Sequence, residues 1–172
     1  MNVAFIPVRG GSKSIPLKNI KPICGKPLVY WTVKAACGCK YIDKVYVATD
    51  SDKIKETVES FKAGIEAELF KKVEVIGRSA ESASDIASTE FAMLEFAGNY
   101  DFDNIVLVQA TSPLLQADDL DHGFEAFNKI YEYIRILRTI NSRVRLKCCI
   151  LNMLSLVNIN VSNCGKCGRY EV

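Results

Sequence analysis

The stretch FIPVRGGSKSIPLKNIKP, residues Phe5–Pro22, begins as an apolar run and turns directly into a loop with two glycines and several basic side chains. Arg9, Lys13 and Lys18 fall within ten residues of one another. Like charges held this close repel, so the cluster is easiest to explain if something strongly anionic lies among them. A nucleoside triphosphate is the ligand that this arrangement suggests.

The chemistry of the loop suits a phosphate chain. Gly10 and Gly11 lack a Cβ, so their backbone N–H groups can approach a phosphate closely. Lys13 and Lys18 supply point charges, and Arg9 supplies a planar fork that can hold two oxygens at once. The spacing matches neither a Walker P-loop nor the dinucleotide fingerprint. A surface turn with solvated lysines remains the alternative.

The rest of the chain predicts an α/β fold. Short Val- and Ile-rich runs suit buried parallel strands at Asn2–Val8, Lys44–Thr49, Lys72–Ile76 and Asn104–Val108. Helical patterns between and after them are predicted from Pro27 to about Ala36, from an Asp50 or Ser51 cap to about Phe61, from Ser84 or Asp85 to Ala97, and from Ala117 to Tyr131. Strands and helices alternating in this way predict a three-layer α/β/α sandwich around a mostly parallel sheet.

Three of the predicted helices have residues that we expect to mark their periodicity. They are Leu28, Trp31 and Ala35 in the first, Phe91, Leu94 and Glu95 in the third, and Leu120, Phe124 and Phe127 in the fourth.

Small or polar residues follow every predicted strand. The segments are RGGSK, TDSD, GRSAESASD and QATSP, in chain order. In open α/β sheets the ligand lies beyond the carboxyl ends of the strands. We therefore expect one site built from several of these loops.

Composition narrows the class of protein. The 172 residues are enough for one domain, and a net charge of +2 with 24% charged residues argues against a general nucleic-acid-binding surface. No apolar run is long enough for a membrane span, and no segment fits a signal peptide, so a cytoplasmic protein is expected. The seven cysteines are then interpreted as reduced thiols.

The composition changes near residue 131. All five prolines and every aspartate lie at or before Asp121. Residues 132–172 carry seven basic and two acidic groups, a net +5, which leaves −3 for residues 1–131. We predict a nucleotide-binding domain over residues 1–131 and an atypical tail over 132–172. A frameshift or truncation is one hypothesis for its origin.

Three segments resemble one family in the same order. IPVRGGSKSIPLKNIKPICGKPLVYW (Ile6–Trp31) resembles the opening motif of the CMP-sugar synthetases, the acylneuraminate cytidylyltransferases that activate sialic acid and related acidic sugars. GRSAESASDIASTE (Gly77–Glu90) and VQATSPL (Val108–Leu114) resemble two further motifs of that family. The resemblance covers about residues 1–129. It implies a Rossmann-like nucleotide-diphospho-sugar transferase fold whose second half is missing or replaced here.

The resemblance also implies an activity and a set of site residues. CMP would pass from CTP to an acidic 2-keto sugar such as an N-acylneuraminate, with release of pyrophosphate. The implied substrate-binding residues are Arg9, Gly10, Gly11, Ser12, Lys13, Lys18, Asn19, Arg78, Ala87, Ser88, Thr89 and Gln109.

These residues have different implied roles. The cations of the first loop would hold the phosphates, and Arg9 and Lys18 would stabilise the leaving pyrophosphate as catalytic residues. Residues 87–89 would lie beside the cytidine, although Ala87 stands where many relatives have a hydroxyl. Asn19, Arg78 and Gln109 would contact nucleotide or sugar.

Plainer interpretations of single residues stay open. Arg78 could be a surface arginine paired with Glu81, and Gln109 could cap the following helix. His122 is predicted on the exposed side of its helix, without a function. The Cys164 and Cys167 pair in the tail has only half the pattern of a zinc site.

The resemblance implies Mg²⁺ as cofactor and a possible homodimer. In this family the Mg²⁺-binding aspartates follow the QATSP segment, and this chain has no aspartate after Asp121, so we expect no metal ligands in it. The alternative function is therefore a nucleotide-binding remnant without turnover. A weaker alternative is an interaction module that uses the basic tail.

Overall fold

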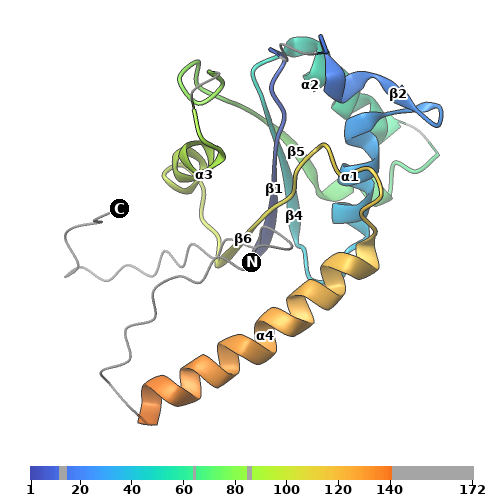
Figure 1. Cartoon of the computed structure of the whole chain (residues 1–172). Coiled ribbons are helices and arrows are strands. Elements are labelled where there is room, and N and C mark those ends of the chain that lie inside the picture. Colours follow the sequence, from blue (N-terminus) through green and yellow to red (C-terminus); the bar gives the residue numbers. More distant parts are fainter. Residues whose placement is uncertain (12–14, 64, 85–86, 141–172) are drawn as a thin grey trace.

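The central sheet has four parallel strands in the order β5-β4-β1-β6 (Figure 1). The computed structural model describes residues 1–11, 15–63, 65–84 and 87–140, with side chains described as far as residue 130. The strands are β1 (Asn2–Pro7), β4 (Lys44–Thr49), β5 (Val73–Gly77) and β6 (Asn104–Leu107). Their bounds lie within one residue of those predicted.

Helices cover both faces of this sheet. They are α1 (Leu28–Gly38), α2 (Asp52–Ser60), α3 (Thr89–Ala97) and α4 (Ala117–Ile140). In Figure 1, α3 lies on one side of the sheet and α1 and α2 lie on the other. The predicted three-layer, mostly parallel α/β sandwich is confirmed.

Alternation along β1 explains the two layers of core. Ala4 and Ile6 pack into the cluster shared with α1, α2 and α4, whereas Val3 and Phe5 pack into the cluster shared with α3. All four side chains are at most 1% exposed. A strand buried on both faces reads as a continuous apolar run, which is the pattern of this segment.

Short elements connect β1 to α1. They comprise the 3₁₀ helix η1 (Lys18–Ile20) and the hairpin of β2 (Pro22–Ile23) and β3 (Lys26–Pro27). Cys24 and Gly25 form its two-residue turn, both with positive φ, 50° and 77°. Left-handed backbone at both central residues matches the twist of a tight hairpin. Two more 3₁₀ helices, η2 (Phe61–Ala63) and η3 (Leu69–Lys72), lie between α2 and β5.

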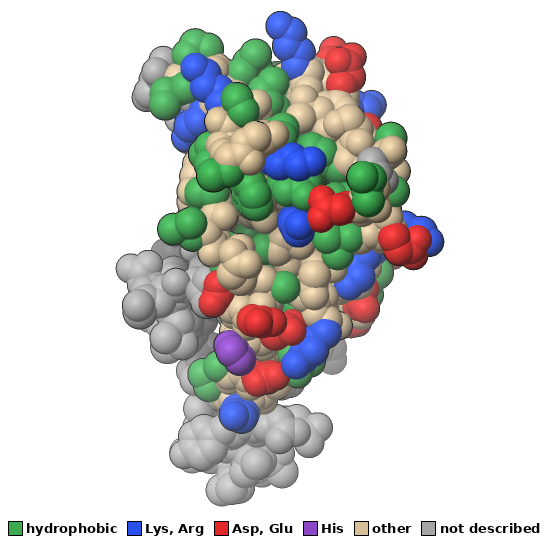
Figure 2. Space-filling view, turned by 90° about the vertical axis from the view of Figure 1, so that its right-hand side faces the viewer, with side chains coloured by type: hydrophobic (Ala, Val, Ile, Leu, Met, Phe, Trp, Pro, Cys, Tyr) green, Lys and Arg blue, Asp and Glu red, His purple; other side chains and the backbone are tan. Residues whose placement is uncertain are grey.

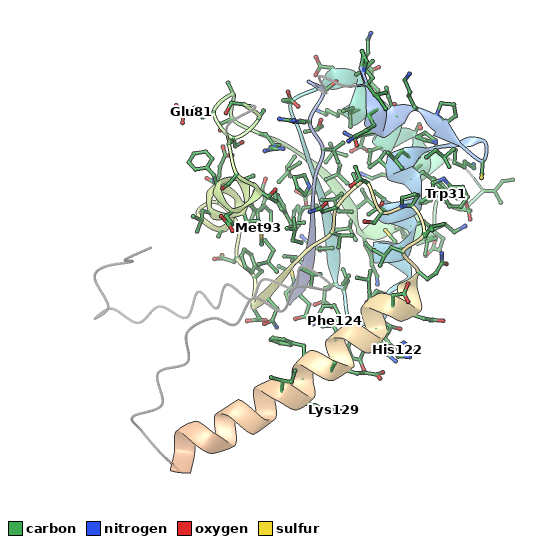
Figure 3. All side chains as sticks on the ribbon, viewed as in Figure 1. Trp31, Glu81, Met93, His122, Phe124 and Lys129 are labelled. Carbon is green, nitrogen blue, oxygen red and sulfur yellow. The ribbon has the colours of Figure 1, made fainter. Side chains whose placement is uncertain are left out.

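Helix α3 differs from its prediction in start and in phase. It begins at Thr89, not at Ser84 or Asp85, because the Ser88 hydroxyl caps it by accepting the Phe91 N–H at 3.1 Å. The buried residues are Ala92, Met93 and Phe96, while Phe91 and Leu94 are exposed. Phe91 and Leu94, which were expected to mark the periodicity of this helix, therefore do not face the core. In Figure 3, Met93 extends from α3 toward the sheet.

Aromatic packing fixes this phase. The Phe96 ring centroid lies 5.0 Å from that of Phe5 and 4.9 Å from that of Tyr46, so the helix docks through Phe96 onto two strands. Pairs at such distances add stabilisation beyond the area they bury.

Helix α4 runs past the predicted end at Tyr131 to Ile140, across the position where the composition changes. Leu120 and Phe124 pack into the core, and His122 is exposed as predicted; Figure 2 shows this histidine at the surface. The division into two parts at residue 131 stays a prediction. Within the described part of the chain, no helix is sufficiently long and apolar for a membrane crossing.

Candidate functional site

A cavity of about 350 Å³ opens at the carboxyl ends of the strands. The order of the strands places β1 beside β6, and the chain reverses its direction of travel across the sheet between them. Such a switch point is where open α/β sheets bind ligands. The lining residues are Pro7, Arg9, Lys18, Asn19, Arg78, Ser82, Ser84, Ala87, Ser88, Thr89, Gln109, Ala110 and Thr111.

The cavity brings together predicted residues from the connections after three strands, β1, β5 and β6. Arg9, Lys18, Asn19, Arg78, Ala87, Ser88, Thr89 and Gln109 all line it. Gly10 and Gly11 are not among its lining residues, and Ser12 and Lys13 lie outside the described part of the chain. The sequence prediction missed Pro7, Ser82, Ser84, Ala110 and Thr111. Ser84, Ala110 and Thr111 are small or polar residues of the family motifs, and this was the signal that could have placed them in the site. Pro7 and the buried Ser82 gave no such signal.

Gly10 serves the packing of the loop after β1. A Cβ on Gly10 would lie 2.8 Å from Ser51 Cβ, closer than real contacts allow, whereas a Cβ on Gly11 would meet none of the described residues within 4 Å. The Gly10 N–H donates to Asp50 Oδ1 at 2.8 Å. This N–H, expected to face a phosphate, is thus engaged by a carboxylate that joins the loop to the end of β4.

Asn19 holds the backbone at Arg9 through a hydrogen bond. It is 6% exposed, and its Nδ2 donates to the Arg9 carbonyl at 3.2 Å. Leu17, which precedes η1, has a φ of 51°, uncommon for a residue with a side chain. This backbone turn leads the chain into η1, where Lys18 lines the same cavity as Arg9.

Arg78, the first residue after β5, lines the cavity. It donates a hydrogen bond to the Ser82 carbonyl, so the interpretation as a surface partner of Glu81 is wrong. In Figure 3, Glu81 lies on the side of this loop that faces away from the sheet. Among buried polar side-chain atoms of the described residues, Arg78 Nε has no hydrogen-bond partner. A ligand oxygen there would remove the cost of leaving that donor unpaired.

The electrostatics around Arg78 favour an anion. Burial lowers the pKa of Arg78 below its ordinary value, and the positive charge of Arg9 lowers it further. Asp50 and Glu95 oppose this by raising the pKa. A guanidinium stays protonated under such shifts, so two like charges face one cavity. Bound phosphate would relieve their repulsion.

Hydroxyl and amide groups also line the cavity. Ser88 lies at the start of α3, and its oxygen accepts the Phe91 N–H. Gln109 lies in the turn after β6, where its carbonyl accepts the Ser112 N–H at 3.2 Å. Because α4 begins only at Ala117, Gln109 does not cap that helix. These groups can hydrogen-bond a ribose or a base.

The cavity does not suit a divalent metal ion. No aspartate or glutamate is among the described residues that line it, and no group of three or more potential ligands occurs in the described part of the chain. Mg²⁺ prefers carboxylate and other oxygen ligands. The residues present therefore do not fit this ion.

Comparison with known proteins agrees with the motifs. A family model described as cytidylyltransferase matches residues 3–160. The chain belongs to the cytidylyltransferase family. This match confirms the predicted resemblance and extends past residue 129, where the resemblance was predicted to end.

Curated members of the cytidylyltransferase family match the same region. The N-acylneuraminate cytidylyltransferase of Oncorhynchus mykiss is 39% identical over 127 residues, 73% of this chain and 27% of the relative. The pseudaminic acid cytidylyltransferase of Campylobacter jejuni is 32% identical over 126 residues, 73% of this chain and 53% of the relative. The chain thus spans between about a quarter and a half of these relatives.

Solved structures show the same fold. A CMP:2-keto-3-deoxy-manno-octonic acid synthetase, solved in complex with CTP, aligns with a TM-score of 0.62 at 22% identity, over 74% of this chain and 47% of that one. A cytidylyltransferase from Leptospira borgpetersenii aligns with a TM-score of 0.55 at 24% identity, over 74% of this chain and 49% of that one.

Proposed function

We propose that this chain binds CTP in the cavity at the carboxyl ends of the strands and transfers its CMP group to an acidic sugar. The observation that carries the proposal is the convergence on that one cavity of Arg9 and Lys18, from the connection after β1, and of Arg78, from the connection after β5. A triphosphate is the ligand whose charge matches such a set. We assign CTP binding to residues 1–131.

The side chains divide the nucleotide between them. Arg9 and Lys18 hold the phosphates, and Asn19 keeps the Arg9 backbone in place through its hydrogen bond to the carbonyl. Ala87, Ser88 and Thr89 lie beside the cytidine. Gln109 and Arg78 contact the nucleotide or the sugar.

The reaction that we propose is a nucleotidyl transfer. The anomeric hydroxyl oxygen of the sugar bonds to the α-phosphorus and loses its proton, while the bond from that phosphorus to the bridging oxygen breaks and pyrophosphate leaves. Negative charge grows on the pyrophosphate, and Arg9 and Lys18 are the groups we assign to stabilise it.

The sugar belongs to the class of acidic 2-keto sugars. Relatives of this chain are named for N-acylneuraminate, pseudaminic acid and 8-amino-3,8-dideoxy-manno-octulosonate. An N-acylneuraminate is our first choice, because relatives named for it reach the highest identity quoted above.

A second candidate function is CTP binding without turnover. It is favoured by the lack of any carboxylate among the described residues that line the cavity. Isothermal calorimetry with CTP tests binding, and pyrophosphate release from CTP, N-acetylneuraminate and Mg²⁺ tests turnover. Binding with release supports the transferase, binding alone supports the second candidate, and no binding overturns both.

Lys18→Ala tests the phosphate contact. We expect it to weaken CTP binding by about 1.5–3 kcal/mol, because a charge-assisted hydrogen bond is lost. Lys21→Ala is the matched control, since Lys21 is exposed on the same segment and does not line the cavity. Equal CTP affinities of the two variants would remove Lys18 from the site.

A further inference from the structure

The turn that follows β5 determines where Arg78 lies. The Ser82 N–H donates to Ser79 Oγ at 3.0 Å, and the Ala83 N–H donates to the Ser79 carbonyl at 3.0 Å. Arg78 in turn donates to the Ser82 carbonyl. The guanidinium is therefore oriented by a carbonyl whose position depends on this turn.

A carboxylate on α3 holds the turn from outside. Glu95 Oε1 accepts the Ser79 N–H at 3.2 Å. Hydrogen bonds from the side chains of Ser82 and Ser79 lower the pKa of Glu95. The positive charge of Arg78 lowers that pKa as well, so Glu95 is an anion held against the turn.

Glu95 and Arg78 line a cavity other than the proposed CTP site. This second cavity, of about 320 Å³, is also lined by Phe96, Asn99 and Tyr100 of the α3 region. Glu95 is absent from the described lining of the first cavity, whereas Arg78 lines both. A ligand in the first cavity would thus meet Arg78 but not Glu95.

Arg78 interacts electrostatically with both Arg9 and Glu95. Arg78 stands near Arg9, and the two guanidinium groups repel in the absence of a ligand. Glu95 attracts Arg78 without blocking the cavity. Removing it would leave Arg78 with fewer restraints against moving away from Arg9.

We infer that Glu95 is a positioning residue for CTP binding: its carboxylate fixes the turn of residues 79–82 and so holds the Arg78 guanidinium at the cavity wall. This inference rests on the proposed function and deepens it. It adds a residue from outside the cavity to the site.

A double-mutant cycle tests the inference. We expect Glu95→Ala to weaken CTP binding about tenfold in the natural sequence and to have little effect once Arg78 is alanine, because residues that share one hydrogen-bond network are coupled. Glu95→Gln keeps an oxygen that can accept the Ser79 N–H and should lose less affinity than Glu95→Ala. Glu90→Gln, an exposed position of the same helix, is the matched control.

A second readout needs no nucleotide. Amide hydrogen exchange of Ser79 and Ser82 should accelerate in Glu95→Ala and stay unchanged in Glu90→Gln, with exchange of the β1 amides as internal reference. Unchanged exchange in Glu95→Ala overturns the inference. The inference is also overturned if Glu95→Ala weakens CTP binding equally in the chain with Arg78 and in the Arg78→Ala variant. If the unsubstituted chain binds no CTP, the proposed function is overturned instead.

Discussion

Gly10 illustrates how one residue joins two strand ends. Its N–H donates to Asp50, and the space where a side chain would begin is occupied by Ser51. The same loop presents Arg9 to the cavity, so close packing on one side of the loop supports the charge on the other. The neighbouring Gly11 has no such restraint among the described residues.

Gly10→Ala should destabilise the fold. The new methyl group would lie 2.8 Å from Ser51 Cβ, and relieving such overpacking costs about 1–3 kcal/mol. Gly11→Ala is the control, and we expect its free energy of unfolding to change by no more than about 1 kcal/mol. Urea denaturation of both variants measures the difference. Equal midpoints would contradict the close contact at Gly10.

At the scale of the element, α3 decides much of the site. Its cap, Ser88, and its first residue, Thr89, line the cavity, while Glu95 lies farther along the helix and holds the turn after β5. Phe96 fixes the rotation of the helix by packing on Phe5 and Tyr46. One short helix therefore supplies lining groups, support and docking.

Ser88→Ala should destabilise α3. The hydroxyl oxygen that accepts the Phe91 N–H would be lost, at a cost of about 1 kcal/mol. Ser51→Ala is the matched control, because Ser51 precedes α2 without a side-chain capping hydrogen bond. Thermal unfolding gives the two changes in stability. A loss at Ser51 as large as that at Ser88 would count against the cap.

At the scale of the whole molecule, two thiols are enclosed where α1 ends. Cys37 and Cys39 are at most 3% exposed, in the core that α1, α2 and α4 share with the sheet. Burial raises the pKa of Cys37 to about 12 and that of Cys39 to about 11, from an ordinary value of 9.0. The folded chain thus keeps these protons where the unfolded chain releases them.

Alkaline pH should therefore destabilise the protein. The contribution of the two thiols to the free energy of unfolding is fully present below pH 9. It falls as the pH rises toward 11, by up to about 1.4 kcal/mol per pH unit for each thiol. Free energies of unfolding, measured under reducing conditions at several values between about pH 8 and about pH 11, give the slope of stability against pH. Cys37→Ala should flatten it, and Cys24→Ser, at an exposed turn, should not. Identical slopes in the two variants would contradict this origin.

Local pattern was enough for the strands and for most of the candidate site. The apolar runs that contain Phe5 and Val47 are buried on both faces of the sheet. Strands of this kind are continuous apolar runs, so their composition was enough to predict them as parallel strands. The motifs that contain Arg9, Arg78 and Gln109 follow strands directly, and carboxyl ends of parallel strands meet at one edge. Residues distant in the chain could therefore be assigned to one site beforehand.

Pattern failed where neighbours decide. Phe91 and Leu94 are as apolar as Met93 and Phe96, and only the rings of β1 and β4 select which pair is buried. Glu95 and Ser82 gave no signal, because a carboxylate among helical residues and a serine in a polar loop are ordinary in themselves. Their hydrogen bonds exist only once α3 lies against the sheet.

The amino-acid order by itself determined the α/β class, the strand positions and the family, because these follow from periodicity and from contiguous motifs. Tertiary structure alone decided which face of α3 is buried, that the Gly10 N–H meets Asp50, and that Glu95 accepts the Ser79 N–H. Those contacts join residues of different elements, and such contacts depend on how the elements pack in space.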